Sequence, residues 1–94
     1  MITAFVLIKT ERHRIPQTAE DLLEVEGVAE VYSVAGEYDL IAILRLKQYD
    51  QLAEVVTSKL ARVDGIVNTQ TLMAFQCYSK KDLEHMWAIG VEPA

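Results

Sequence analysis

The chain has 94 residues, of which 51% are hydrophobic and 24% are charged, with only four Gly and two Pro. This length and composition predict one small folded domain and exclude disordered and collagen-like chains. The net charge of −5 argues against direct binding of nucleic acid, which needs a basic surface. With a lone cysteine, Cys77, no secretory signal and no long apolar run, we expect a cytoplasmic protein without disulfides that does not enter a membrane.

Two similar segments follow one another along the chain. The sequence VEGV at residues 25–28 recurs as VDGI at residues 63–66, in each case between a predicted helix and a predicted strand. The chain is therefore predicted to consist of two copies of a strand, helix, strand unit.

The first copy begins with a strand over residues 3–9, whose apolar run is too continuous for a half-exposed strand. Pro16 suits the first turn of a helix, and Gly27 is its predicted stop. Residues 28–35 alternate between apolar and polar side chains, which is typical of a strand, and residues 36–39 are predicted to form a turn.

The second copy repeats this order. A strand over residues 40–46 is followed by a helix over about residues 50–63, with Asp50 as its expected N-cap and Gly65 as its stop. The last predicted strand covers residues 66–75.

This order predicts an α+β fold of the ferredoxin-like βαββαβ type: a four-stranded antiparallel sheet with both helices on one face. The strands expected at the centre, residues 3–9 and 40–46, are apolar on both faces, so the free face is not expected to contact water. We expect dimerisation through the sheets. The alternative is a sheet covered by the C-terminal tail of its own chain.

The tail is predicted to add a C-terminal helix. Over residues 79–90, Ser79 and Asp82 have the spacing of a capping box, and Leu83, Met86 and Trp87 form an apolar stripe. We therefore divide the chain into a ferredoxin-like domain, residues 1–78, and a helical tail, residues 79–94.

Catalytic chemistry has little support in the sequence. His13 and His85 are expected in solvent, and neither has metal-ligand spacing to Cys77 or to the other His. The basic residues at 9–14 are interpreted as a solvated loop. We expect no catalytic residue, no metal site and no cofactor.

The predicted turn at residues 36–39 carries groups that suit a small polar ligand. Gly36 allows close approach to backbone N–H groups, Asp39 offers a carboxylate to an ammonium group, and Tyr38 offers a ring and a hydroxyl. Thr69 and Thr71 share one face of the last strand and present two hydroxyls in line. A plain hairpin turn and ordinary strand propensity are the alternative explanations.

Residues 27–40 resemble the second strand and ligand loop of the effector-binding domain of the Lrp/AsnC family, also called the RAM domain. The most specific part is the pattern of Val, small residue, Gly, two residues and Asp at residues 34–39. Residues 64–66 and the Thr69-x-Thr71 pair support it, and the resemblance extends over about residues 3–78.

The resemblance implies a ferredoxin-like fold that forms dimers and often octameric rings, with an amino-acid effector held between dimers. It places Gly36, Tyr38 and Asp39 at the effector loop, with Thr69 and Thr71 approaching from the strand. Three features depart from the family pattern. The first strand follows Met1 at once, which resembles a stand-alone form without a helix-turn-helix domain, and Ala35 stands where the family commonly has Thr. The predicted tail helix from Ser79 extends beyond the part that resembles the family.

The function expected from these observations is an oligomeric module that senses an amino acid or similar metabolite and acts by co-assembly with full-length Lrp/AsnC regulators. The alternative is a small enzyme of the dimeric α+β barrel kind, similar to a monooxygenase. Asn68 is the one residue that fits such an enzyme's cavity. A structural oligomer without ligand stays open as a third interpretation.

Overall fold

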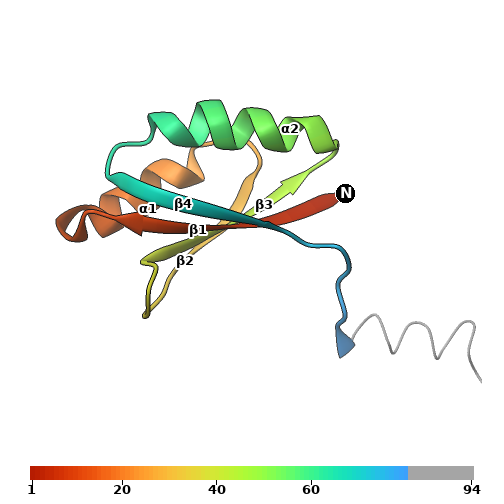
Figure 1. The fold of residues 1–94 in the computed structure, drawn as a ribbon, viewed down its shortest axis with the longest axis horizontal. Coiled ribbons are helices and arrows are strands. Elements are labelled where there is room, and N and C mark those ends of the chain that lie inside the picture. The colour runs from red at the N-terminus through yellow and green to blue at the C-terminus, as the bar shows by residue number, and fades with distance from the viewer. Residues whose placement is uncertain (81–94) are drawn as a thin grey trace, which may run out of the picture.

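The computed structural model describes residues 1–80, which contain the two predicted strand, helix, strand units (Figure 1). The first unit consists of β1 (Ile2–Thr10), α1 (Ile15–Leu23) and β2 (Val28–Ser33). The second consists of β3 (Leu40–Leu46), a helical segment that begins with α2 (Tyr49–Glu54), and β4 (Ile66–Met73). None of the helices within these 80 residues is both long enough and apolar enough to span a membrane.

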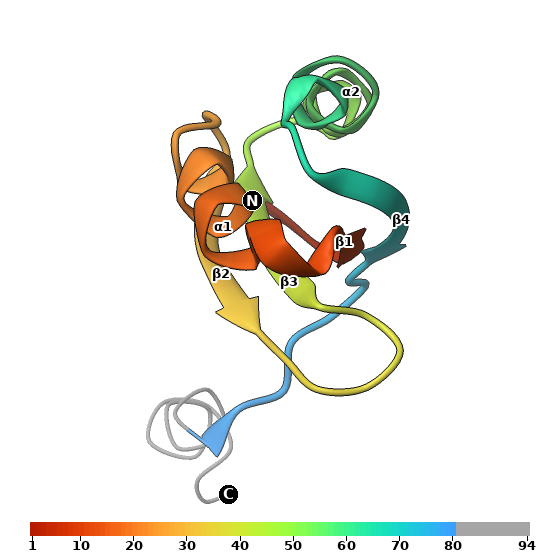
Figure 2. The same ribbon diagram turned by 90° about the vertical axis from the view of Figure 1, so that its left-hand side faces the viewer.

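The four strands form one antiparallel sheet in the order β2-β3-β1-β4. The two strands predicted to be apolar on both faces, β1 and β3, are therefore the central pair. Both helices lie on one face of the sheet (Figures 1 and 2). This arrangement confirms the predicted ferredoxin-like βαββαβ fold.

The core lies between the sheet and the helices. Every second residue of the central strands points into it, so that Ala4, Val6 and Ile8 of β1 are fully buried. The strand β3 contributes Leu40, Ala42, Leu44 and Leu46 to the same cluster. The helical segments contribute Leu22, Leu52, Val55 and Leu60. Burial of this apolar set is the main stabilising contribution that the sequence supplies.

The opposite face of the sheet, here called the open face, is also apolar at its centre. Phe5 pairs with Ile43 of β3 on one side and with Leu72 of β4 on the other. The open face consists of Phe5, Leu7, Tyr32, Ile41, Ile43 and Leu72. No helix of the described chain covers it (Figure 2). Tyr32 and Leu72 are exposed and Phe5, Leu7 and Ile41 are half-buried, whereas Ile43 is buried.

Two features of the second helical segment differ from the prediction. Asp50 is not the N-cap: Gln48 occupies that position, in a reciprocal capping box with Gln51. The Gln51 side-chain oxygen accepts the backbone N–H groups of Lys47 and Gln48, which satisfies donors that a helix start leaves free. After α2 the segment continues as a π-helical turn, Val55–Lys59, and a 3₁₀ turn, Leu60–Arg62.

Three further features of the structure also differ from the prediction. The segment predicted to be a loop after β1 contains a 3₁₀ turn, Arg12–Arg14. The strands β2 and β4 end at Ser33 and Met73, two residues earlier than predicted. The predicted C-terminal helix lies, from residue 81 onward, outside the described residues.

Candidate functional site

The connection between β2 and β3 is held closely against the sheet. The Val34 backbone N–H donates to Asp39 O (3.0 Å), and the Asp39 backbone N–H donates to Ile8 O (2.9 Å). Gly36 lies within this turn with φ +124°, a conformation that a residue with a side chain rarely adopts. Because a Cβ at Gly36 would have no atom within 4 Å, the space beside the turn is open.

Asp39 fixes the turn to the end of β1. Its carboxylate oxygen Oδ2 accepts a hydrogen bond from the Thr10 backbone N–H at 2.9 Å. The β1–β4 register shifts between Lys9 and Thr10, so this bond lies at an irregularity of the ladder. Within residues 1–80, Asp39 Oδ1 makes no hydrogen bond, which leaves one carboxylate oxygen for a ligand.

Tyr38 connects the same turn to the edge strand β4. Its hydroxyl donates to Gln70 Oε1 at 2.8 Å. Gln70 pairs with Leu7 of β1, so it belongs to the open-face side of the sheet. The turn leads directly into β3, and through Tyr38 it reaches across β1 to contact β4. Gln70 was not predicted at the site, because alternation along β4 places it on the same face as Asn68 and Leu72 without indicating a partner.

A cavity of about 480 Å³ opens beside the turn. It brings together two cations and two carboxylates, so its formal charges balance. Its lining consists of Lys9, Thr10, Arg12, Gly36, Glu37, Asp39 and Val67. Gly36 and Asp39 were predicted at a ligand site, whereas Lys9 and Arg12 were assigned to a solvated loop. The chemistry of this lining suits a small molecule that carries both an ammonium and a carboxylate group.

The two predicted threonines lie elsewhere in the single chain. Thr69 and Thr71 pair with Ile8 and Val6, on the side of β4 that faces the helices. Thr69 lines a different cavity of about 290 Å³, together with Val56, Leu60, Ala61, Ile66, Val67 and Asn68. Neither threonine lines the cavity beside Gly36, and their assignment to the ligand site stays a prediction.

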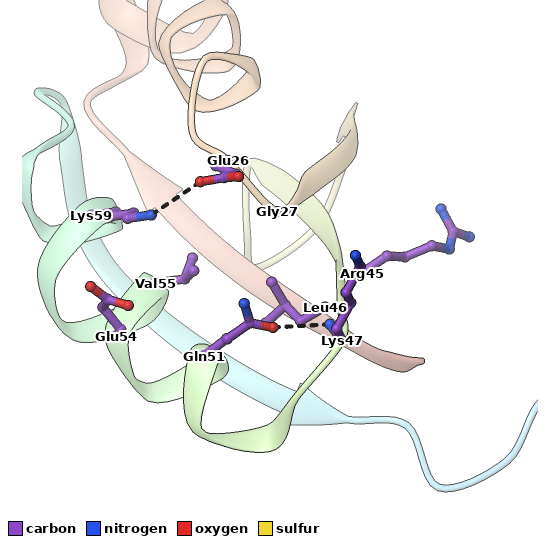
Figure 3. Close-up of a pocket in the computed structure, with 9 residues that line it drawn as sticks. All are labelled: Glu26, Gly27, Arg45, Leu46, Lys47, Gln51, Glu54, Val55 and Lys59. Carbon is purple, nitrogen blue, oxygen red and sulfur yellow. Dashed lines mark hydrogen bonds and ion pairs between the residues drawn. The ribbon is translucent and has the colours of Figure 1, made fainter.

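A third cavity, of about 260 Å³, lies at the other end of the β2–β3 hairpin (Figure 3). Two contacts join its lining residues: Lys59 Nζ lies 3.8 Å from Glu26 Oε1, and the Lys47 backbone N–H donates to Gln51 Oε1 (3.0 Å). The remaining lining residues are Gly27, Arg45, Leu46, Glu54 and Val55. It contains none of the residues that the sequence assigned to a ligand.

Comparisons of this chain with a family model and with curated proteins agree with one another. Residues 3–83 match the model of the Lrp/AsnC ligand binding domain. An uncharacterized HTH-type transcriptional regulator of Pyrococcus abyssi is 34% identical over 80 residues, which cover 78% of this chain and 51% of that protein. The chain thus spans about half the length of the curated relatives that it matches.

Solved structures share the fold. TTHA0845 from Thermus thermophilus is 46% identical with a TM-score of 0.78, and the match covers 85% of this chain and all of that one. The feast or famine regulatory protein of M. tuberculosis, solved in complex with L-methionine, is 22% identical with a TM-score of 0.68, over 86% of this chain and 55% of that one. From the family match, the sequence similarity and the shared fold, we conclude that this chain belongs to the Lrp/AsnC family and forms its ligand-binding domain.

Proposed function

We propose that this domain senses an amino acid or a closely similar metabolite in the cavity beside the Gly36 turn. One observation carries the proposal: Asp39, which holds the turn with Oδ2 alone, lines a cavity that Lys9 and Arg12 also line. In the proposed complex the ammonium group of the ligand binds Asp39 Oδ1. Its carboxylate binds the cations and the backbone N–H groups of the Gly36 turn.

The relatives support this choice of ligand. The M. tuberculosis protein named above carries L-methionine, and its fold matches that of this chain. Methionine has the ammonium and carboxylate groups that the cavity can recognise. Since Ala35 lacks a hydroxyl, we expect the ligand side chain to find fewer polar partners at this turn.

We further propose that the active form is an oligomer. The open face presents Phe5, Leu7 and Leu72 without cover from a described helix, and a second sheet packed on it would remove this apolar surface from water. Dimers formed in this way would associate further into an octamer. Effector sites at the contacts between dimers would then receive Tyr38 from one subunit and Thr69 and Thr71 from another.

The proposed role in transcription is indirect. The net charge of −5 makes the chain a poor ligand for DNA, whereas the relatives that it matches over half their length are named HTH-type regulators. We propose that the domain works in the cytoplasm by co-assembly with such a regulator and changes that regulator's response to the effector. In this proposal the chain is a binding module and not an enzyme. Asn68, the residue that favoured an enzyme, bonds its own strand through Oδ1 to the Thr69 N–H (2.9 Å).

A thermal-melt panel of the twenty amino acids tests the sensing role. A ligand that binds only the folded protein adds about 2.7 kcal/mol of stability at a hundred times its Kd, which raises Tm by roughly 10 to 20 °C in a domain of this size. We expect at least one amino acid to raise Tm in the parent and to raise it less in Asp39→Asn. A panel without any shift at millimolar concentration would exclude an amino-acid sensor.

A further inference from the structure

The chain that follows β4 leaves the body of the domain on the side away from the helices. Residues 74–80, here called the arm, extend below the sheet in both views, on the side of the open face (Figures 1 and 2). The start of the arm is fixed, because the Ala74 backbone N–H donates to Thr3 O at 3.0 Å. The direction of the arm is therefore set at the edge of the sheet.

The arm carries aromatic side chains that its own domain does not cover. Phe75 is 98% exposed and Tyr78 is 78% exposed, the former being the most exposed of the large hydrophobic residues described. Burying a phenylalanine side chain is worth about 1.5 to 3 kcal/mol relative to leaving it in water. An apolar residue at this position indicates a contact that residues 1–80 of a single chain do not provide.

The open face shows where that contact lies. Leu72, the last open-face residue of β4, stands two positions before Ala74, so the apolar surface of the sheet continues directly into the arm. A second subunit packed on the open face occupies the space into which the arm extends. Seven residues reach at most about 25 Å when extended, whereas packed sheets are separated by about 10 Å. The arm is long enough to pass alongside the second sheet.

We propose that the arm of each subunit packs against the other subunit of the sheet-to-sheet dimer, with Phe75 as its anchor. In a two-fold dimer both arms make the same contact, so each sheet is held from two sides. This inference rests on the proposed dimer but is separate from the effector site, because none of the arm residues lines the cavity beside Gly36. The occupant of the surface is a second copy of this chain.

The single cysteine offers a direct test. Cys77 lies in the arm, is exposed and forms no disulfide, so benzophenone-maleimide labels the full chain at one position. Labelled unenriched protein is mixed with unlabelled ¹⁵N protein, unfolded, refolded together and illuminated. We expect cross-linked peptides that join residue 77 of the unenriched chain to the ¹⁵N chain. Their abundance should fall severalfold in the labelled Phe75→Ser variant and be retained in Phe75→Tyr.

Sedimentation of the unlabelled variants gives a second readout. We expect Phe75→Ser to raise the dimer dissociation constant at least tenfold. Tyr49→Ser, which removes a ring that is 66% exposed at the start of α2, should leave the constant unchanged. If the protein stays dimeric but residue 77 cross-links only to unenriched chains, and never to a ¹⁵N chain, the arm contact is wrong and the sheet dimer still stands. A monomeric parent would overturn both the arm contact and the sheet dimer, whereas the amino-acid panel tests the cavity beside Gly36 separately.

Discussion

The Asp39 carboxylate and the Thr10 backbone N–H lie 2.9 Å apart although they are separated by 29 positions in the sequence. This bond joins the β2–β3 turn to the end of the neighbouring strand, where the β1–β4 ladder changes register. One carboxylate oxygen thus has a structural role, and Asp39 also lines the cavity beside Gly36. The two roles of Asp39 can be separated by substitution.

Asp39→Ala removes both the hydrogen bond and the charge. Since a hydrogen bond to a charged group contributes about 1.5 to 3 kcal/mol, and this site is only partly buried, we expect a loss near the lower figure. Asp39→Asn keeps an oxygen that accepts the Thr10 N–H and should lose less than half as much. Urea unfolding of the two variants compares these values. Equal losses would mean that the charge, rather than the hydrogen bond, holds the turn.

Tyr38→Phe removes the hydroxyl that donates to Gln70. We expect a loss of about 0.5 to 1 kcal/mol in unfolding free energy and faster hydrogen exchange at the Asp39 N–H, because the turn loses its contact with β4. Tyr32→Phe is the matched control, since its hydroxyl bonds Glu30 on its own strand. Unchanged exchange at Asp39 in Tyr38→Phe would show that the contact does not restrain the turn.

Two glycines with positive φ should respond differently to alanine. At Gly36, where φ is +124° and the space is open, we expect only the backbone cost of about 1 to 2 kcal/mol. At Gly65, where φ is +95°, the new Cβ also runs into Thr18 Oγ1, which donates to Asp64 O (3.1 Å). Gly65→Ala should therefore lose about 2 to 4 kcal/mol. Denaturant midpoints measure the difference, and a larger loss at Gly36 would contradict it.

The two faces of β1 should separate association from folding. Phe5→Asp places a charge on the open face, and we expect a folded monomer because an unpaired charge in a buried interface costs several kcal/mol. Val6→Asp places the charge in the core, where the parent side chain is fully buried, and should unfold the chain. Leu23→Asp, on the exposed side of α1, is the control that stays dimeric.

Light scattering measures the association state of these variants, and circular dichroism measures whether they are folded. A Phe5→Asp protein that elutes and scatters as a dimer would contradict association through the open face.

The sequence was sufficient to predict the order of elements and the central position of β1 and β3, because their continuous apolar runs exclude an edge strand. It did not predict the π-helical turn at Val55–Lys59, since Leu52, Val55 and Leu60 have the same apolar pattern in either helix type. Asp50 was predicted to be the N-cap of the second helix because aspartate is intrinsically favoured at that position. Gln48 takes that place because its side chain and that of Gln51 satisfy each other's backbone N–H groups.

The lining of the cavity beside Gly36 was predicted in part. Gly36 and Asp39 carry local signals of turn geometry and charge, and the structure brings both to the same cavity. Lys9 and Arg12 have no such signal, because they approach the turn only once β1 pairs with β3 and the chain turns after Thr10. The bond between Tyr38 and Gln70 is similarly non-local. Contacts of this kind follow from the register of the sheet and not from spacing along the chain.

Isothermal titration of Asp39→Asn with the amino acid that raises Tm most in the parent tests the central claim most directly. We predict that the variant binds this amino acid 10- to 100-fold more weakly than the parent, with its dimer intact. Thr71→Val, which removes a neutral hydroxyl, should weaken binding about fivefold. If Asp39→Asn binds as tightly as the parent, the carboxylate only shapes the turn, and the ligand site proposed at Gly36 and Asp39 is wrong.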